Sequence, residues 1–147
     1  MTASAGERGH SSGQTLVEFA LVLIPFVFLL MGIFDLGRGI YVNNGVAQAA
    51  REIARTTSVH TGSPLGQSSE TQATIATQKN LVPGLADPSA KVTVVCTDVY
   101  DVVTSTTTCG PGDFVRVTVS VPFRVLTLAI GMSKPMTLGS TAHVEVP

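Results

Sequence analysis

Glu18 is an acidic residue at the entrance to a long apolar segment. Residues 19–34, FALVLIPFVFLLMGIF, carry no charge and end immediately before Asp35. As a helix, with about 1.5 Å of rise per residue, this segment covers roughly 24 Å, which is less than the roughly 30 Å hydrocarbon core of a bilayer. A membrane span would therefore include residues 14–17 and hold Glu18 within it. An acid costs up to about 3 kcal/mol at the centre of a membrane helix and less near its ends, so Glu18 is a candidate functional residue.

The other polar residues give little support for catalysis. The sequence contains no glycine-rich phosphate loop, no G-x-S-x-G pattern and no H-E-x-x-H pattern. His143 and Glu145 alternate onto the polar side of an expected strand, where a solvated pair is the simpler interpretation. Asp98, Asp101 and Asp113 could line a cation site on adjacent loops, and ordinary loop acids are the alternative. We therefore expect no catalytic residue, no cofactor and no small-molecule substrate.

Cys96 and Cys109 enclose a threonine-rich loop and allow one intrachain pairing. A disulfide is expected if this part of the chain lies outside the cytoplasm, and it would stabilise the fold by roughly 3 kcal/mol. Two free thiols are the alternative. A zinc site is not expected, because zinc usually takes about four ligands and the histidines, His10, His60 and His143, are scattered.

The composition points to an unusual concentration of apolar residues. The chain has 147 residues, of which 44% are hydrophobic and only 13% are charged, against roughly 25% charged in an average soluble domain. This composition excludes global disorder. The 9 basic and 10 acidic residues give a net charge of -1, which argues against nucleic-acid binding, since phosphate contacts need a surplus of Lys and Arg.

Two ordinary interpretations of the apolar segment leave Glu18 unexplained. The first is a secretory signal peptide, with Arg8 before the segment and a cleavage pattern at residues 47–49. That pattern lies too far beyond Phe34, because the apolar region of a signal peptide is expected close to its cleavage site. The second is an uncleaved single-span anchor, in which the acid has only a cost.

One helix is expected over residues 14–57, apolar at first and amphipathic later. Ile33, Ile40, Ala47 and Ala54 recur every seven residues, and Leu36 and Ala50 join the same stripe. This period is typical of a helix packed along one seam, and the change to small residues permits close approach of another backbone. Pro25 removes one helix hydrogen bond. We expect the first turns to serve the membrane or a filament and the residues after about 40 to cover a small β domain.

Residues 58–90 are expected to form a polar linker that contains one short helix. Ser69, followed three positions later by Gln72, fits a capping box. The sequence Val82-Pro83-Gly84 is expected to end this helix.

Residues 91–147 change to a period of two. Apolar residues alternate with polar ones over residues 92–97, 115–121 and 138–146, which is typical of half-buried strands. Pro122 is expected to end the second strand or to lie at an edge. A long helix against one face of an antiparallel sheet belongs to the α+β class, so this is the fold class that we expect.

The order of motifs in residues 13–55 is more specific than any one of them. Gly13 is followed by Glu18 at the fifth position and then by Phe19. Further features follow in order: Pro25 inside the apolar run, the step Asp35-Leu36-Gly37-Arg38, then Tyr41, and the segment AAREIAR at residues 49–55. This ordered set resembles the front of TadE/TadF-like proteins, the pseudopilins of tight-adherence pilus systems, which have a type IV pilin-like N-terminus.

The resemblance implies a processing site between Gly13 and Gln14. A prepilin peptidase would remove a leader, residues 1–13, on the cytoplasmic side. Gln14 would then carry a free amine one helical turn from Glu18, on the same or a neighbouring subunit. Removing one partner from a buried ion pair costs roughly 3–5 kcal/mol, so the pair would select the register of helices packed side by side.

The same resemblance implies a pilin-like topology, a cytoplasmic N-terminus and an extracytoplasmic β domain over residues 91–147. The implied partners are the membrane, the prepilin peptidase, other pilin-like subunits and the inner-membrane pilus platform. We therefore expect a membrane-inserted pseudopilin or minor pilus subunit that takes part in pilus assembly through helix packing. The alternative is an uncleaved single-span anchor that presents a small extracytoplasmic binding domain.

Overall fold

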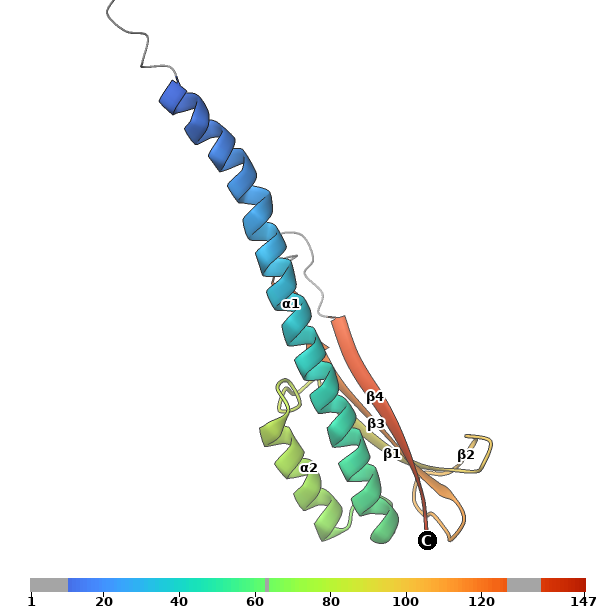
Figure 1. Cartoon of the computed structure of the whole chain (residues 1–147). Helices are drawn as coiled ribbons and strands as arrows, with labels where there is room; N and C mark the ends of the chain where they lie inside the picture. Colours follow the sequence, from blue (N-terminus) through green and yellow to red (C-terminus); the bar gives the residue numbers. More distant parts are fainter. Residues whose placement is uncertain (1–10, 63, 127–135) are drawn as a thin grey trace, which may run out of the picture.

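The computed structural model describes residues 11–62, 64–126 and 136–147. Within them the elements follow in this order: α1 (Ser11–Val59), α2 (Ser69–Leu81), β1 (Lys91–Thr97), β2 (Val103–Ser105), β3 (Phe114–Phe123) and β4 (Met136–Glu145). The strands form one antiparallel sheet in the order β2-β1-β3-β4. Helix α1 packs on this sheet, and α2 lies along the inner part of α1 (Figure 1). The expected α+β class is confirmed.

Helix α1 has an outer half that projects from the molecule and an inner half that packs on the sheet (Figure 1). Its 49 residues correspond to a length of about 73 Å. The large apolar side chains from Leu16 to Phe34 are all exposed, and Asp35, at 7% exposure, is the first buried residue. The helix continues through Pro25 without a break. One helix therefore belongs both to the domain and to the projection.

The inner half of α1 buries a stripe of small and branched side chains against the sheet. The members recur every three or four positions: Val42, Val46, Ala49, Ile53 and Thr57. Ala50 and Ala54 are also buried, as the sequence predicts, whereas Ile33, Leu36 and Ile40 are 58%, 65% and 54% exposed. The buried apolar residues thus begin at Val42, in agreement with the expectation that the residues after about 40 cover the β domain, and the outer members of the stripe lie outside this contact. The apolar residues there do not belong to the core of the domain.

Strand β3 is the centre of the sheet and supplies much of the core. Alternate residues point into the helix-covered face, and four valines are fully buried: Val115, Val117, Val119 and Val121. On either side, Val117 pairs with Val94 of β1 and with Ala142 of β4. The alternation in sequence predicted β1, β3 and β4. It did not predict β2, which has only three residues and pairs with β1 at Cys96 and Thr97.

Helix α2 begins after Ser68 and ends before Val82. The side chain of Ser68 accepts a hydrogen bond from the backbone N–H of Thr71 at 3.2 Å, so the capping residue is Ser68 and not Ser69 as predicted. The expected end of the helix is observed, and Gly84 follows with φ of 85°. This left-handed conformation favours glycine because it has no Cβ.

Candidate functional site

The outer half of α1 has the properties of a membrane-spanning segment. Among the described residues, α1 is the one helix that is long and apolar enough to cross a bilayer, and none of its most apolar 18-residue window is buried. Exposed apolar patches of this extent in a folded domain mark an interaction with a membrane or another protein. The candidate functional surface is therefore the projecting half of the helix, and not a cleft in the domain.

Gln14 and Glu18 lie one turn apart near the free end of this surface. The side-chain amide of Gln14 donates a hydrogen bond to the Glu18 carboxylate, with 3.4 Å between Nε2 and Oε1. Gly13 lies one residue earlier in the same helix, and a Cβ at Gly13 would have no heavy atom within 4 Å. Of the predicted leader, residues 1–10 lie outside the described part of the chain. The three predicted residues of the processing and pairing site thus share one exposed helix end.

A groove marks the point where α1 reaches the sheet. Its volume is about 570 Å³, and it is lined mainly by apolar and small residues of α1, of β3 and the segment directly after it, and of β4: Gly32, Asp35, Leu36, Gly39, Ile40, Asn43, Phe123, Val125, Met136 and Leu138. Phe123 packs beside Gly39, where a Cβ would lie in ordinary contact distance, 3.6 Å from the phenylalanine ring.

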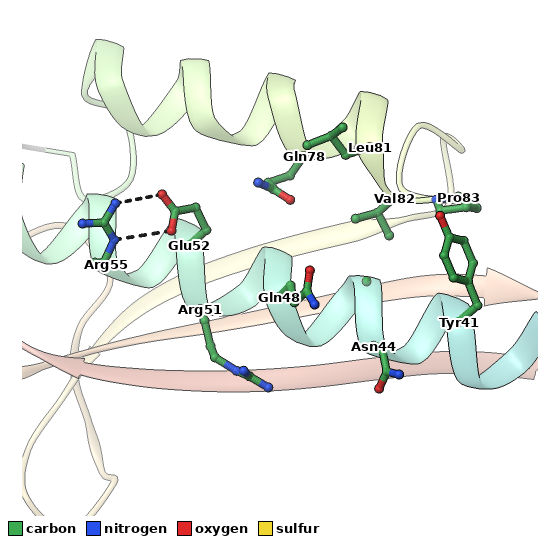
Figure 2. Close-up of a pocket in the computed structure, with 11 residues that line it drawn as sticks. Tyr41, Asn44, Gln48, Arg51, Glu52, Arg55, Gln78, Leu81, Val82 and Pro83 are labelled. Atoms are coloured by element: carbon green, nitrogen blue, oxygen red, sulfur yellow. Dashed lines mark hydrogen bonds and ion pairs between the residues drawn. The ribbon is translucent and has the colours of Figure 1, made fainter.

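A second and more polar groove, of about 740 Å³, lies between α1 and α2. Figure 2 shows Tyr41 extending toward Pro83 at one end and Arg55 bonded to Glu52 at the other. The ion pair has an N–O distance of 3.0 Å and is largely exposed, so it contributes little to stability. The lining residues include no cysteine, histidine, serine or threonine.

Arg38 makes a cluster with the end of β3 that the sequence did not reveal. Its guanidinium carbon lies 4.7 Å from the centre of the Phe123 ring, and its Nη2 donates a hydrogen bond to the carbonyl oxygen of Arg124. The available signal was the position of Arg38, four residues after the end of the apolar segment at Phe34. Its partners are more than 80 positions away, at a sheet end that only the fold brings to the helix.

Cys96 and Cys109 are joined by a disulfide, with 5.4 Å between their Cα atoms. The Asp113 carboxylate lies beside them, 3.6 Å from the sulfur of Cys96, and accepts a hydrogen bond from the backbone N–H of Gly110. The three side chains lie close enough together for a metal site. Because the two sulfur atoms are bonded to each other, neither is a thiolate that could hold a metal. The arrangement fixes the end of β1 to the loop before β3.

The remaining candidate acids are separated into different local contacts. Asp98 accepts backbone hydrogen bonds from Tyr100 and Val102 and so shapes its own turn. Asp101 instead pairs with Arg116 at 2.9 Å, and His143 approaches the same carboxylate at 3.5 Å. His143 is thus close to Asp101, while its predicted neighbour Glu145 lies two positions further along β4. The acids do not form a common cation site.

In the part of the chain that the structure describes, the domain is carried by one long apolar helix, which indicates a single-pass membrane anchor. Residues 13–55 match the model of a family described as TadE-like protein. The match covers the residues that carry the resemblance noted in the sequence, so that resemblance is confirmed, and it indicates a role related to tight-adherence pilus systems. No curated protein and no solved structure matches the chain.

Proposed function

We propose that this protein is a pseudopilin or minor pilus subunit of a tight-adherence system and acts by helix packing, not by catalysis. The observation that carries the proposal is the fully exposed outer half of α1. Such a surface needs hydrocarbon or other apolar helices around it. A bilayer supplies the first environment, and the centre of a helical filament supplies the second.

Glu18 is proposed to set the register of this packing. Cleavage after Gly13 leaves the amine of Gln14 on the same helix turn as the Glu18 carboxylate. Both groups are costly to bury alone and much less costly as a pair. The hydrogen bond from the Gln14 amide to Glu18 supports the pairing, because it places the two residues on the same side of the helix.

The proposed membrane topology and the proposed partners follow from this role. The N-terminus lies in the cytoplasm, where a prepilin peptidase cuts the leader, and the β domain lies outside it, where the disulfide persists. The inner-membrane platform and other pilin-like subunits are the proposed partners during assembly.

The N-terminus of the protein from membranes of its own host tests the processing step. Mass spectrometry is expected to find a chain that begins at Gln14. In a Gly13→Leu variant we expect the uncut chain, and the open space around Gly13 means that this change disturbs no folded contact. An uncut wild-type chain would reject the processing step and favour the alternative, a plain anchor that presents the β domain. A start near Ala50 would show a secreted domain and reject both.

A Glu18→Gln variant tests the pairing separately. We expect this variant to reach the membrane and to be depleted at least tenfold from the sheared pilus fraction, measured by immunoblot. The matched control is Glu70→Gln, which removes an exposed carboxylate from α2 in the domain. Normal assembly of the Glu18 variant would show that the carboxylate does not set the register, even if the leader is cleaved.

A further inference from the structure

A hollow of about 360 Å³ lies where α1 first packs against the end of β3, with two arginines on its rim. The lining residues come from α1, from the turn after α2 and from the end of β3: Arg38, Tyr41, Val42, Pro83, Gly84, Pro122, Phe123 and Arg124. We call it the Arg38–Arg124 hollow. It shares Phe123 with the adjacent apolar groove, which contains the buried Asp35.

The guanidinium of Arg38 is held in place on one side of this hollow. It stacks on the ring of Phe123, which is 8% exposed, and donates one hydrogen bond to the Arg124 carbonyl. A guanidinium carries five N–H donors in a planar fork, so donors remain for a further acceptor. Arg is well suited to phosphate because two of its N–H groups can reach two phosphate oxygens together.

The position of the hollow along α1 corresponds to the headgroup region of a bilayer. This step rests on the proposed insertion of the outer half of α1. Arg38 follows the last residue of the uncharged segment, Phe34, by about 6 Å of helix rise. Tyr41, which is 64% exposed, lies one further turn along, and tyrosines are enriched at this level of membrane proteins.

The charged side chains that line the hollow are both positive. Among the residues that line it, Arg38 and Arg124 are charged and both are basic. Asp87 lies near Arg124 and offsets part of its charge. The pKa of Asp87 is lowered mainly by hydrogen bonds from Ser89, and in smaller part by Arg124. An anionic group is therefore the complement that the hollow lacks.

We propose that the Arg38–Arg124 hollow binds the phosphate of an anionic phospholipid in the leaflet on the domain side of the membrane. The bound headgroup fixes the height of the domain above the bilayer, because the hollow joins the helix to the sheet. An acidic side chain of a neighbouring subunit is the competing occupant.

Lipid binding by the full chain in neutral detergent tests the proposal. Native mass spectrometry counts the lipid retained during titration with phosphatidylglycerol, phosphatidylcholine or glycerol phosphate. We expect phosphatidylglycerol to bind at least tenfold more tightly than the other two. An Arg38→Gln/Arg124→Gln variant is expected to lose about tenfold or more of this affinity, as for the loss of charge-assisted hydrogen bonds. The control Arg51→Gln/Lys79→Gln removes two exposed basic side chains elsewhere and is expected to bind within twofold of the wild type.

Three results would overturn the lipid site. The first is a double variant that binds phosphatidylglycerol as tightly as the wild type. The second is a control variant that loses as much affinity as the double variant. The third is binding of glycerol phosphate as tight as that of the lipid. Arg124→Gln alone serves if the double variant unfolds, because Arg124 is exposed and the contact with Phe123 is made by Arg38. Extraction of the wild type from membranes by alkaline carbonate would instead reject the proposed insertion of α1, and this result is independent of lipid retention in detergent.

Discussion

The hydroxyl oxygens of Thr57 and Thr71 lie 3.4 Å apart in the buried contact between α1 and α2. Thr57 donates its proton to the carbonyl oxygen of Ile53 at 2.7 Å, and Ser68 donates to the Thr71 hydroxyl at 2.8 Å. Each hydroxyl has one proton, so Thr71 donates to Thr57. A chain of hydrogen bonds therefore runs from the start of α2 into the core of α1.

A Thr57→Val variant should destabilise the domain by about 1–3 kcal/mol, because the buried Thr71 hydroxyl loses its acceptor. A Thr57→Val/Thr71→Val variant should recover part of this loss, since both buried partners are then apolar. Urea unfolding of the detergent-solubilised chain gives the free energy of unfolding of each variant. A double variant that is no more stable than Thr57→Val would contradict this role of the hydrogen bond between the threonines.

Replacement of Ser68 by Ala should cost about 1 kcal/mol, within the usual range for a lost helix cap. The matched control is Ser69→Ala. This serine is the cap predicted from sequence, but its side chain bonds only the neighbouring Glu70, and we expect a change below about 0.5 kcal/mol. Comparison of the two unfolding midpoints decides between the residues. A larger effect at Ser69 would contradict the observed cap.

Loss of the disulfide should lower the free energy of unfolding by about 2–4 kcal/mol. We suggest Cys96→Ala/Cys109→Ala, since a single change leaves a free thiol. Unfolding of this variant should be insensitive to reductant, whereas reductant should shift the wild type toward it. A wild-type midpoint that does not move in reductant under unfolding conditions would show that the bond is absent from the purified protein.

Ser89 should govern the titration of Asp87. The Asp87 carboxylate accepts hydrogen bonds from the backbone N–H and the hydroxyl of Ser89, at 2.8 and 2.5 Å. These bonds, with a smaller effect of Arg124, hold the pKa of Asp87 below its ordinary value of 3.8. NMR titration should show this pKa rising in a Ser89→Ala variant and rising less in Arg124→Gln.

The sign of the stability change follows from the same shift. Because the folded pKa of Asp87 is lowered, its contribution is complete above the unfolded value and is lost as the pH falls through the folded value. The Ser89 variant should therefore differ most from the wild type above about pH 4. A difference that grew at lower pH would contradict the role of the charged carboxylate.

Several elements could be predicted because local patterns and burial agree in them. The valine alternation of β3 coincides with full burial of one face, and the run after Glu18 is exposed as a membrane segment requires. Periodicity alone did not show where the helix passes from one environment to the other, because lipid and a protein core select the same apolar side chains. Ile40 is 54% exposed, and the buried stripe runs through Val42, Val46 and Ala49.

Long-range partners could not be predicted from spacing. The contact between Arg38 and Phe123 depends on how β3 ends beside α1, and no local pattern carries that register. The cap on α2 failed by one position because two serines are adjacent and each has a plausible partner three residues later. Strand β2 is too short to show a period of two, and its pairing depends on the turn shaped by Asp98.

Helix α1 is continuous, and among the described residues only its inner half is held by packing in the domain. Its inner half is fixed by Val46 and Ile53 in the core, so rotation of the outer half about its own axis turns the whole domain through the same angle. Pro25 is the proline inside α1, and its missing N–H makes that turn the natural place for bending. A bend at Pro25 would therefore tilt the domain from a point within the apolar segment, roughly three turns before the sheet begins.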